Sequence, residues 1–179
     1  MVKKSARRTH RTHNPFFKAR VALAALIAMA RGFVYLKAVV DVASRRVMAH
    51  KVAITLAACH AKEVIEQAFV RHGSPQIVNV DQGESVHRDR VHRGRTGQGL
   101  QVSMDGRGAW RESVFVKRFW RSLRYERVVC RAYDSVSAAR TDIAQYVERF
   151  NVQRPHSSLA DATPDEFCYA DEPTIGQVA

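Results

Sequence analysis

One carboxylate stands where many α/β proteins carry their chemistry. Asp81 directly follows a short apolar segment, residues 77–80, that is typical of a buried strand. In α/β folds the carboxyl ends of the strands form the edge of the sheet at which ligands bind. A carboxylate at that edge can be a ligand of a divalent cation, since Mg²⁺ prefers hard oxygen ligands. The alternative is a structural acid that is paired with a neighbouring cation.

A predicted helix over residues 111–128 carries the second pattern with chemical meaning. Its aromatic and aliphatic residues recur every four positions and predict one buried face. Four cations share another side of the helix: Lys117, Arg118, Arg121 and Arg124. Such a basic stripe can contact a phosphate backbone, because this contact needs only charge and reach. The alternative is a solvated basic face.

The overall charge of the chain agrees with a polyanionic partner. The 179 residues include 29 Lys or Arg against 17 Asp or Glu, which gives a net charge of +12 and a pI near 10.3. Residues 1–40 contain nine of these cations and no acid. We therefore expect nucleic acid as the partner, ahead of an acidic membrane surface. Residues 1–20 are predicted to be a basic, disordered tail.

The cysteines and apolar runs indicate a reduced, cytoplasmic protein. Cys59, Cys130 and Cys168 are odd in number, far apart and without CxxC spacing, so neither a disulfide framework nor a zinc site is expected. The apolar run from Val21 to Met29 is too short to span a bilayer. Because Arg31 follows soon after it, we expect neither a membrane span nor export.

Hydrophobic periodicity predicts an α/β domain with a mixed sheet over residues 21–169. Strands are predicted at 33–42, 47–54, 77–81 and 100–104. Helices are predicted at 61–72, 111–128 and 135–150, and a last short helix begins with Thr163 as its cap and Pro164 at its first position. Residues 82–99, rich in glycine and arginine, are expected to form a mobile loop, and residues 170–179 a disordered tail.

Four ordered motifs of this chain resemble those of bacterial insertion-sequence transposases with an rve-type integrase core. They are YLKAVVDVASRRV at 35–47, NVDQG at 79–83, SMDGRG with VFVKRFWRSLRYE within 103–126, and FNVQRPHSSL with TPDEF within 150–167. Together they span most of the chain, from Gly32 to Phe167. The resemblance implies a ribonuclease-H-like fold. It also implies phosphoryl transfer on DNA by two Asp and one Glu that hold two Mg²⁺ ions.

The resemblance further implies which residues occupy the catalytic positions. Asp81 matches the second Asp, and the family's spacing of 35 intervening residues leads from it to Lys117, where the family has Glu. The first Asp of the family falls on Leu23. Because the ammonium of Lys117 would repel Mg²⁺, we expect Asp81 to be a paired acid and Mg²⁺ not to bind. Asp41 is expected to accept hydrogen bonds from turn amides or to pair with a neighbouring arginine.

The expected function is that of a transposase core that is catalytically impaired and still binds DNA. The predicted DNA contacts are Arg107, Lys117, Arg118, Arg121, Arg124 and Arg154. His156 is expected to be structural or to face DNA, since metal-assisted transfer needs no general base. Besides DNA, a second copy of the chain or an intact transposase is an expected partner, in the bacterial cytoplasm and without a membrane. Two alternatives remain: an active enzyme that recruits other acids or an intact partner chain, and a non-catalytic DNA-binding or transposase-inhibiting module.

Overall fold

The computed structural model describes residues 18–73, 75, 77–80, 101–104 and 109–170 of the chain. The loop predicted at 82–99 and most of the two predicted tails lie outside the described residues. Among the described helices, none is long and apolar enough to cross a lipid bilayer.

Five strands form one mixed sheet in the order β3-β2-β1-β4-β5. The strands are β1 (Lys18–Ala28), β2 (Phe33–Asp41), β3 (Val47–Ala53), β4 (Ile77–Val80) and β5 (Gln101–Met104). β1, β2 and β3 are antiparallel neighbours, whereas β4 runs parallel to both β1 and β5. This arrangement confirms the predicted mixed α/β sheet. Each of the four predicted strands agrees with an observed strand to within one residue at either end.

β1 is the central strand, and it begins inside the segment that the sequence predicts as a tail. Its first residue is Lys18, whereas the predicted tail extends to residue 20. The strand is rich in alanine and holds few β-branched side chains, so strand propensity alone does not predict it. It forms because its backbone pairs on both sides: Val21 is paired with Val39 of β2 and with Val80 of β4.

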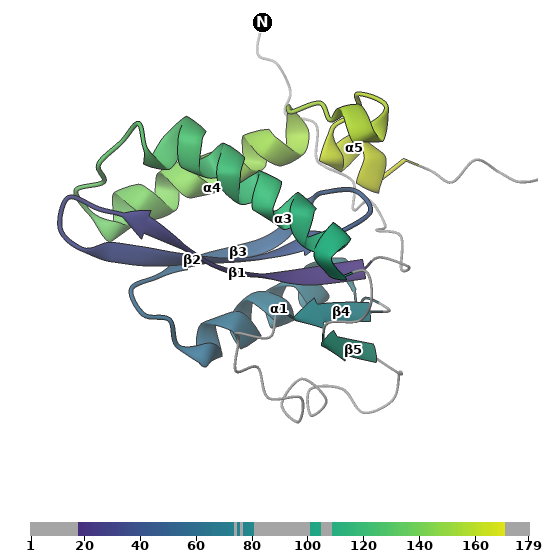
Figure 1. The fold of residues 1–179 in the computed structure, drawn as a ribbon, viewed down its shortest axis with the longest axis horizontal. Coiled ribbons are helices and arrows are strands. Elements are labelled where there is room, and N and C mark those ends of the chain that lie inside the picture. The colour runs from purple at the N-terminus through teal and green to yellow at the C-terminus, as the bar shows by residue number, and fades with distance from the viewer. Residues whose placement is uncertain (1–17, 74, 76, 81–100, 105–108, 171–179) are drawn as a thin grey trace, which may run out of the picture.

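Helices cover both faces of the sheet (Figure 1). α1 (Ala58–His72) packs on β2 and β3 from one side, and α3 (Ala109–Leu123) and α4 (Val136–Val152) lie on the other. The helix ends follow the predicted signals. Gly73, with φ of 83°, ends α1, and the side chain of Ser135 caps α4 by accepting the amide of Ala138. The last helix, α5 (Pro164–Cys168), begins with the predicted Thr163 cap, which forms a capping box with Glu166.

The main core lies between the sheet and the pair α3 and α4. Its large side chains include Leu36 of β2, Phe119 and Leu123 of α3, and Ile143 and Phe150 of α4. The rings of Phe119 and Phe150 meet edge to face with centroids 5.0 Å apart. This contact joins α3 to α4 over the sheet, so the face of α3 that bears its cations must point elsewhere.

Two buried polar side chains fix the connection between β2 and β3. Asp41 accepts hydrogen bonds from the amides of Ala43 and Ser44 at 3.3 and 3.0 Å, which confirms its predicted role as an acceptor for turn amides. Asn151, near the end of α4, accepts from the amide of Val47 at 2.9 Å and donates to its carbonyl at 3.0 Å. The Asn151 amide thus replaces a strand neighbour for the first residue of β3.

Candidate functional site

The sheet brings the end of β4 beside the middle of β1. Val80, the last residue of β4, is paired in parallel with Val21. Leu23, the residue that the resemblance predicts at the position of the family's first Asp, lies on β1 two residues further along, where the pairing with β2 shifts register between Ala22 and Ala25. Asp81, the residue that follows β4 in the sequence, lies outside the described residues, as does Arg107.

α3 presents the four predicted cations to solvent. Val116, Phe119 and Leu123 are buried on the sheet side of the helix. Four residues of the same helix and its continuation are exposed: Lys117, Arg118, Arg121 and Arg124. The structure therefore confirms the amphipathic division of the helix, with its apolar side in the core and its basic stripe on the surface.

The helix changes its hydrogen bonding at Arg124, a feature that the sequence does not predict. Residues Arg124–Val128 form a π-helix, and the amide of Val129 donates to the carbonyl of Arg124 at 2.9 Å. Each π-turn holds an extra residue, which displaces the side chains that follow; single π-turns inside helices occur often at functional sites. Here the wider turn leaves the ring of Tyr125 61% exposed beside the cations.

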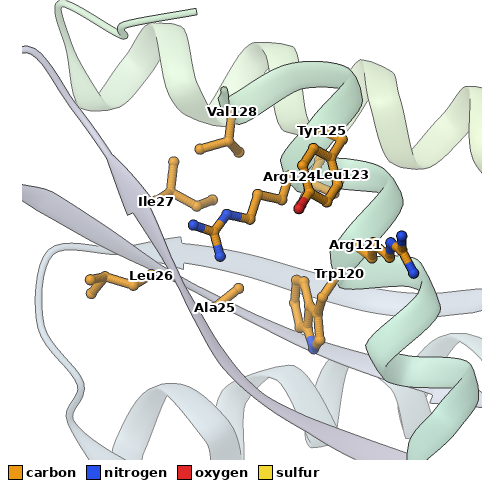
Figure 2. Close-up of a pocket in the computed structure, with 9 residues that line it drawn as sticks. All are labelled: Ala25, Leu26, Ile27, Trp120, Arg121, Leu123, Arg124, Tyr125 and Val128. Atoms are coloured by element: carbon orange, nitrogen blue, oxygen red, sulfur yellow. The ribbon is translucent and has the colours of Figure 1, made fainter. Parts of the chain in front are cut away.

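A cavity of about 480 Å³ opens between the end of β1 and this part of α3. Figure 2 shows the residues that line it: Ala25, Leu26, Ile27, Trp120, Arg121, Leu123, Arg124, Tyr125 and Val128. The guanidinium of Arg124 extends into the cavity toward Ile27, whereas the guanidinium of Arg121 points away from it. The cavity is thus an apolar and aromatic hollow with one cation inside it and a second at its border.

Sequence reasoning missed this cavity. Trp120 belongs to the predicted helix over residues 111–128, and in the structure it is half-buried and lines the cavity wall. Tyr125 belongs to one of the four motifs, and the sequence alone predicts no role for it. A tryptophan and a tyrosine interleaved with arginines at 120–125 are the available signal, since aromatic and basic side chains together are typical of nucleic-acid contacts.

Arg154, the sixth predicted DNA contact, is held in an ion pair. Its Nη1 donates to Oε1 of Glu126 at 2.6 Å, and the hydroxyl of Tyr146 donates to the other oxygen of the same carboxylate at 3.2 Å. Burial and the charge of Glu126 raise the pKa of Tyr146 to about 12. The structure therefore groups Arg154 with Glu126 and Tyr146, and it does not bring Arg154 into the stripe on α3.

His156 has the surroundings of a structural residue. Its ring packs edge to face on Phe150, with centroids 5.0 Å apart. Its Nε2 is buried and has no hydrogen-bond partner among the described residues. Burial and the nearby charges of Arg154 and Arg45 lower the pKa of His156 below its usual value, so the ring is neutral near pH 7. A neutral, packed ring supports a structural role for His156, rather than the alternative role of facing DNA.

The residues that the resemblance assigns to the catalytic positions do not have the chemistry to hold a pair of magnesium ions. In the register that the resemblance gives, Leu23 offers no oxygen ligand and Lys117 offers an ammonium, which leaves Asp81 as one carboxylate. Two Mg²⁺ ions need several carboxylate oxygens, because each ion is held in a near-octahedral oxygen shell.

The sequence of this chain is similar to those of known transposases. Residues 98–164 match the family model of the integrase core domain. The chain is 26% identical over 139 residues, 76% of its length, to the transposase for insertion sequence element IS904 of Lactococcus lactis subsp. lactis (strain IL1403), of which it covers 55%. It is equally similar over the same length to transposase InsF for insertion sequence IS3A of Escherichia coli (strain K12), of which it covers 48%. The chain thus spans about half the length of these curated relatives.

Solved structures with the same fold are retroviral integrase cores. The integrase catalytic core domain of HTLV-2, solved in complex with magnesium, superposes with a TM-score of 0.64 at 14% identity and covers 88% of this chain and 99% of its own. The catalytic core domain of BIV integrase gives a TM-score of 0.61 at 17% identity, with 84% and 92% covered. These similarities show a ribonuclease-H-like fold. The family model over residues 98–164 and the curated relatives show that this chain is similar to insertion-sequence transposases that have an integrase core.

Proposed function

We propose that this chain binds duplex DNA through the basic stripe of α3 and does not perform two-metal strand transfer with its own residues. The observation that carries the proposal is the exposure of Lys117, Arg118 and Arg121 on α3, with the exposed Arg124 following directly after the helix at the cavity. Four cations within about two helical turns match the spacing of phosphates closely enough for several contacts at once. The relationship to transposases makes DNA the expected polyanion.

The loss of strand transfer follows from the residue types at the catalytic positions. Leu23 and Lys117 replace two carboxylates, and a cation at position 117 favours a phosphate over a metal ion. The same substitution would therefore weaken magnesium binding and strengthen DNA binding at one place. As a protein partner we propose a second copy of the chain or an intact transposase. In mixed complexes with an intact transposase, the chain would compete with active subunits.

Salt-dependent binding to a labelled duplex tests the DNA contact. If all four cations contact phosphates, the logarithm of the binding constant should fall with the logarithm of salt concentration with a slope of about −3.6, from roughly −0.9 per contact. The double variant Lys117→Gln, Arg121→Gln should reduce the slope to about −1.8. A matched control removes two exposed cations from α1, on the other face of the sheet, as Lys62→Gln, Arg71→Gln. Equal slopes for the two double variants would refute contact through the stripe.

Strand-transfer assays with Mg²⁺ or Mn²⁺ separate the impaired core from the two alternatives. We expect no joined product from the chain alone. Product that disappears in Asp81→Asn would establish an active enzyme that recruits other acids. The chain can also be added to an intact transposase and compared with its Lys117→Gln, Arg121→Gln variant. Stronger inhibition by the parent chain than by the variant would favour a module that inhibits through DNA binding. Equal inhibition by the variant would favour mixed complexes between the two proteins.

A further inference from the structure

The first turns of α1 bring together three side chains that are typical metal ligands. One ligand atom from each of Cys59, His60 and Glu63 lies within 4.8 Å of the other two. The Sγ of Cys59 lies 3.8 Å from Nδ1 of His60, and the same Nδ1 lies 3.7 Å from Oε2 of Glu63. The cluster belongs to the face of the sheet opposite α3, so it is separate from the proposed DNA contact (Figure 1).

Two of the three separations come close to what a tetrahedral zinc ion needs. Bonds of about 2.0–2.3 Å to nitrogen, oxygen and sulfur place neighbouring ligand atoms roughly 3.3–3.7 Å apart. The distances of 3.8 and 3.7 Å therefore have to close by only a few tenths of an ångström, and the separation between Cys59 and Glu63 lies within 4.8 Å. Thiolate, imidazole and carboxylate are also the ligand types that Zn²⁺ takes in proteins, and three of them leave the fourth position for water.

Thr55 supplies the hydrogen bond that would orient the imidazole. Its Oγ1 lies 3.2 Å from Nε2 of His60, on the side of the ring that faces away from Cys59 and Glu63. The tautomer with its proton on Nε2 donates to this hydroxyl and leaves the lone pair of Nδ1 directed at the other two ligands. Metal-bound histidines in proteins are held by such a partner on the second ring nitrogen.

We propose that Cys59, His60 and Glu63 form a zinc-binding site at the start of α1. Lys51 opposes the ion, because its ammonium forms an ion pair with the same oxygen of Glu63. Zinc therefore has to displace a cation from its carboxylate ligand, and the positive end of α1 adds to this opposition. The thiolate of Cys59 and the carboxylate of Glu63 supply two negative charges against it. The site is expected to be a moderate one whose affinity Lys51 limits.

Titration of the reduced full chain with Co²⁺ tests the site, since a thiolate bonded to Co²⁺ gives a charge-transfer absorption that carboxylates and water do not. We expect one Co²⁺ per chain with this absorption, and its loss when Zn²⁺ is added. Cys59→Ser should abolish the absorption, and Thr55→Ala should weaken binding roughly tenfold or more. Cys130→Ser, which removes the other exposed cysteine among the described residues, is the matched control and should behave as the parent chain.

Lys51→Ala is the most decisive variant. Removal of this charge should tighten metal binding, whereas general destabilisation of the fold would weaken it. We expect the affinity for Zn²⁺ to rise in this variant and to fall in Glu63→Gln. Circular dichroism verifies that each variant is folded. No thiolate absorption in the folded parent chain, an absorption that persists in Cys59→Ser, or equal loss in Cys130→Ser would each overturn the proposal. Binding of DNA is not involved in any of these measurements, so they are independent of the stripe on α3.

Discussion

The replacement Asn151→Ala should destabilise the fold more than its small change in volume suggests. Asn151 is 5% exposed and makes two hydrogen bonds to the backbone of Val47, at 2.9 and 3.0 Å. Without the amide, a buried N–H and a buried C=O lose their side-chain partner. Each such group costs about 1–3 kcal/mol, so the free energy of unfolding should fall by about 2–6 kcal/mol. This is a large part of the roughly 5–15 kcal/mol that keeps a domain folded.

Urea denaturation followed by circular dichroism measures this loss as a lower midpoint at an unchanged slope. The matched control is Gln153→Ala, which removes an exposed amide two residues further along the chain and should change the free energy by about 0.5 kcal/mol or less. A loss below about 1 kcal/mol for Asn151→Ala would show that water or a rearranged backbone replaces the amide. The attachment of α4 to β3 would then depend on apolar packing alone.

Three further outcomes are expected. Mg²⁺ should raise the melting temperature of the double variant Leu23→Asp, Lys117→Glu and should not raise that of the parent chain. No rise in the variant would mean that these two residues do not occupy the catalytic positions. Folding raises the pKa of Tyr146 from 10.0 to about 12, so the contribution of this tyrosine to the free energy of unfolding is fully present below pH 10 and is lost as pH rises toward about 12. A titration of the folded chain, followed by tyrosinate absorbance, that shows no tyrosine with a raised pKa would contradict this. Arg154→Met should change stability by about 1 kcal/mol or less, because the ion pair with Glu126 is largely exposed to solvent. A marked loss of DNA affinity in that folded variant would restore Arg154 as a DNA contact.

Most of the helices and outer strands could be predicted because their patterns are local. The hairpin of β2 and β3 is dense in valine, and α4 and α5 begin with cap residues whose side chains accept backbone amides. The exposed stripe on α3 follows from the same helical period that buries Phe119. Such features depend on residues within one or two turns, and the sequence contains that information directly.

The features that could not be predicted depend on distant segments. β1 lacks a strong strand pattern and exists because β2 and β4 pair with it on both sides. The π-helix from Arg124 keeps a helical composition, so no residue type marks the change of hydrogen bonding. The cluster of Cys59, His60 and Glu63 has no CxxC pair that would mark it in the sequence, because one helical turn brings Glu63 to the other two side chains.

The central position of β1 has a consequence for how the chain reaches its fold in a cell. β1 is synthesised before β2 and β3, with which it can form a local meander, but its parallel edge must wait until α1 and β4 have been made. During that interval the nascent domain exposes an unpaired, alanine-rich and leucine-rich edge, which is the type of surface that recruits other chains. Lys18 and Arg20 lie on that waiting edge, in register with Ile77 and Asn79. This edge is therefore completed only when β4, which follows α1 in the sequence, has been synthesised.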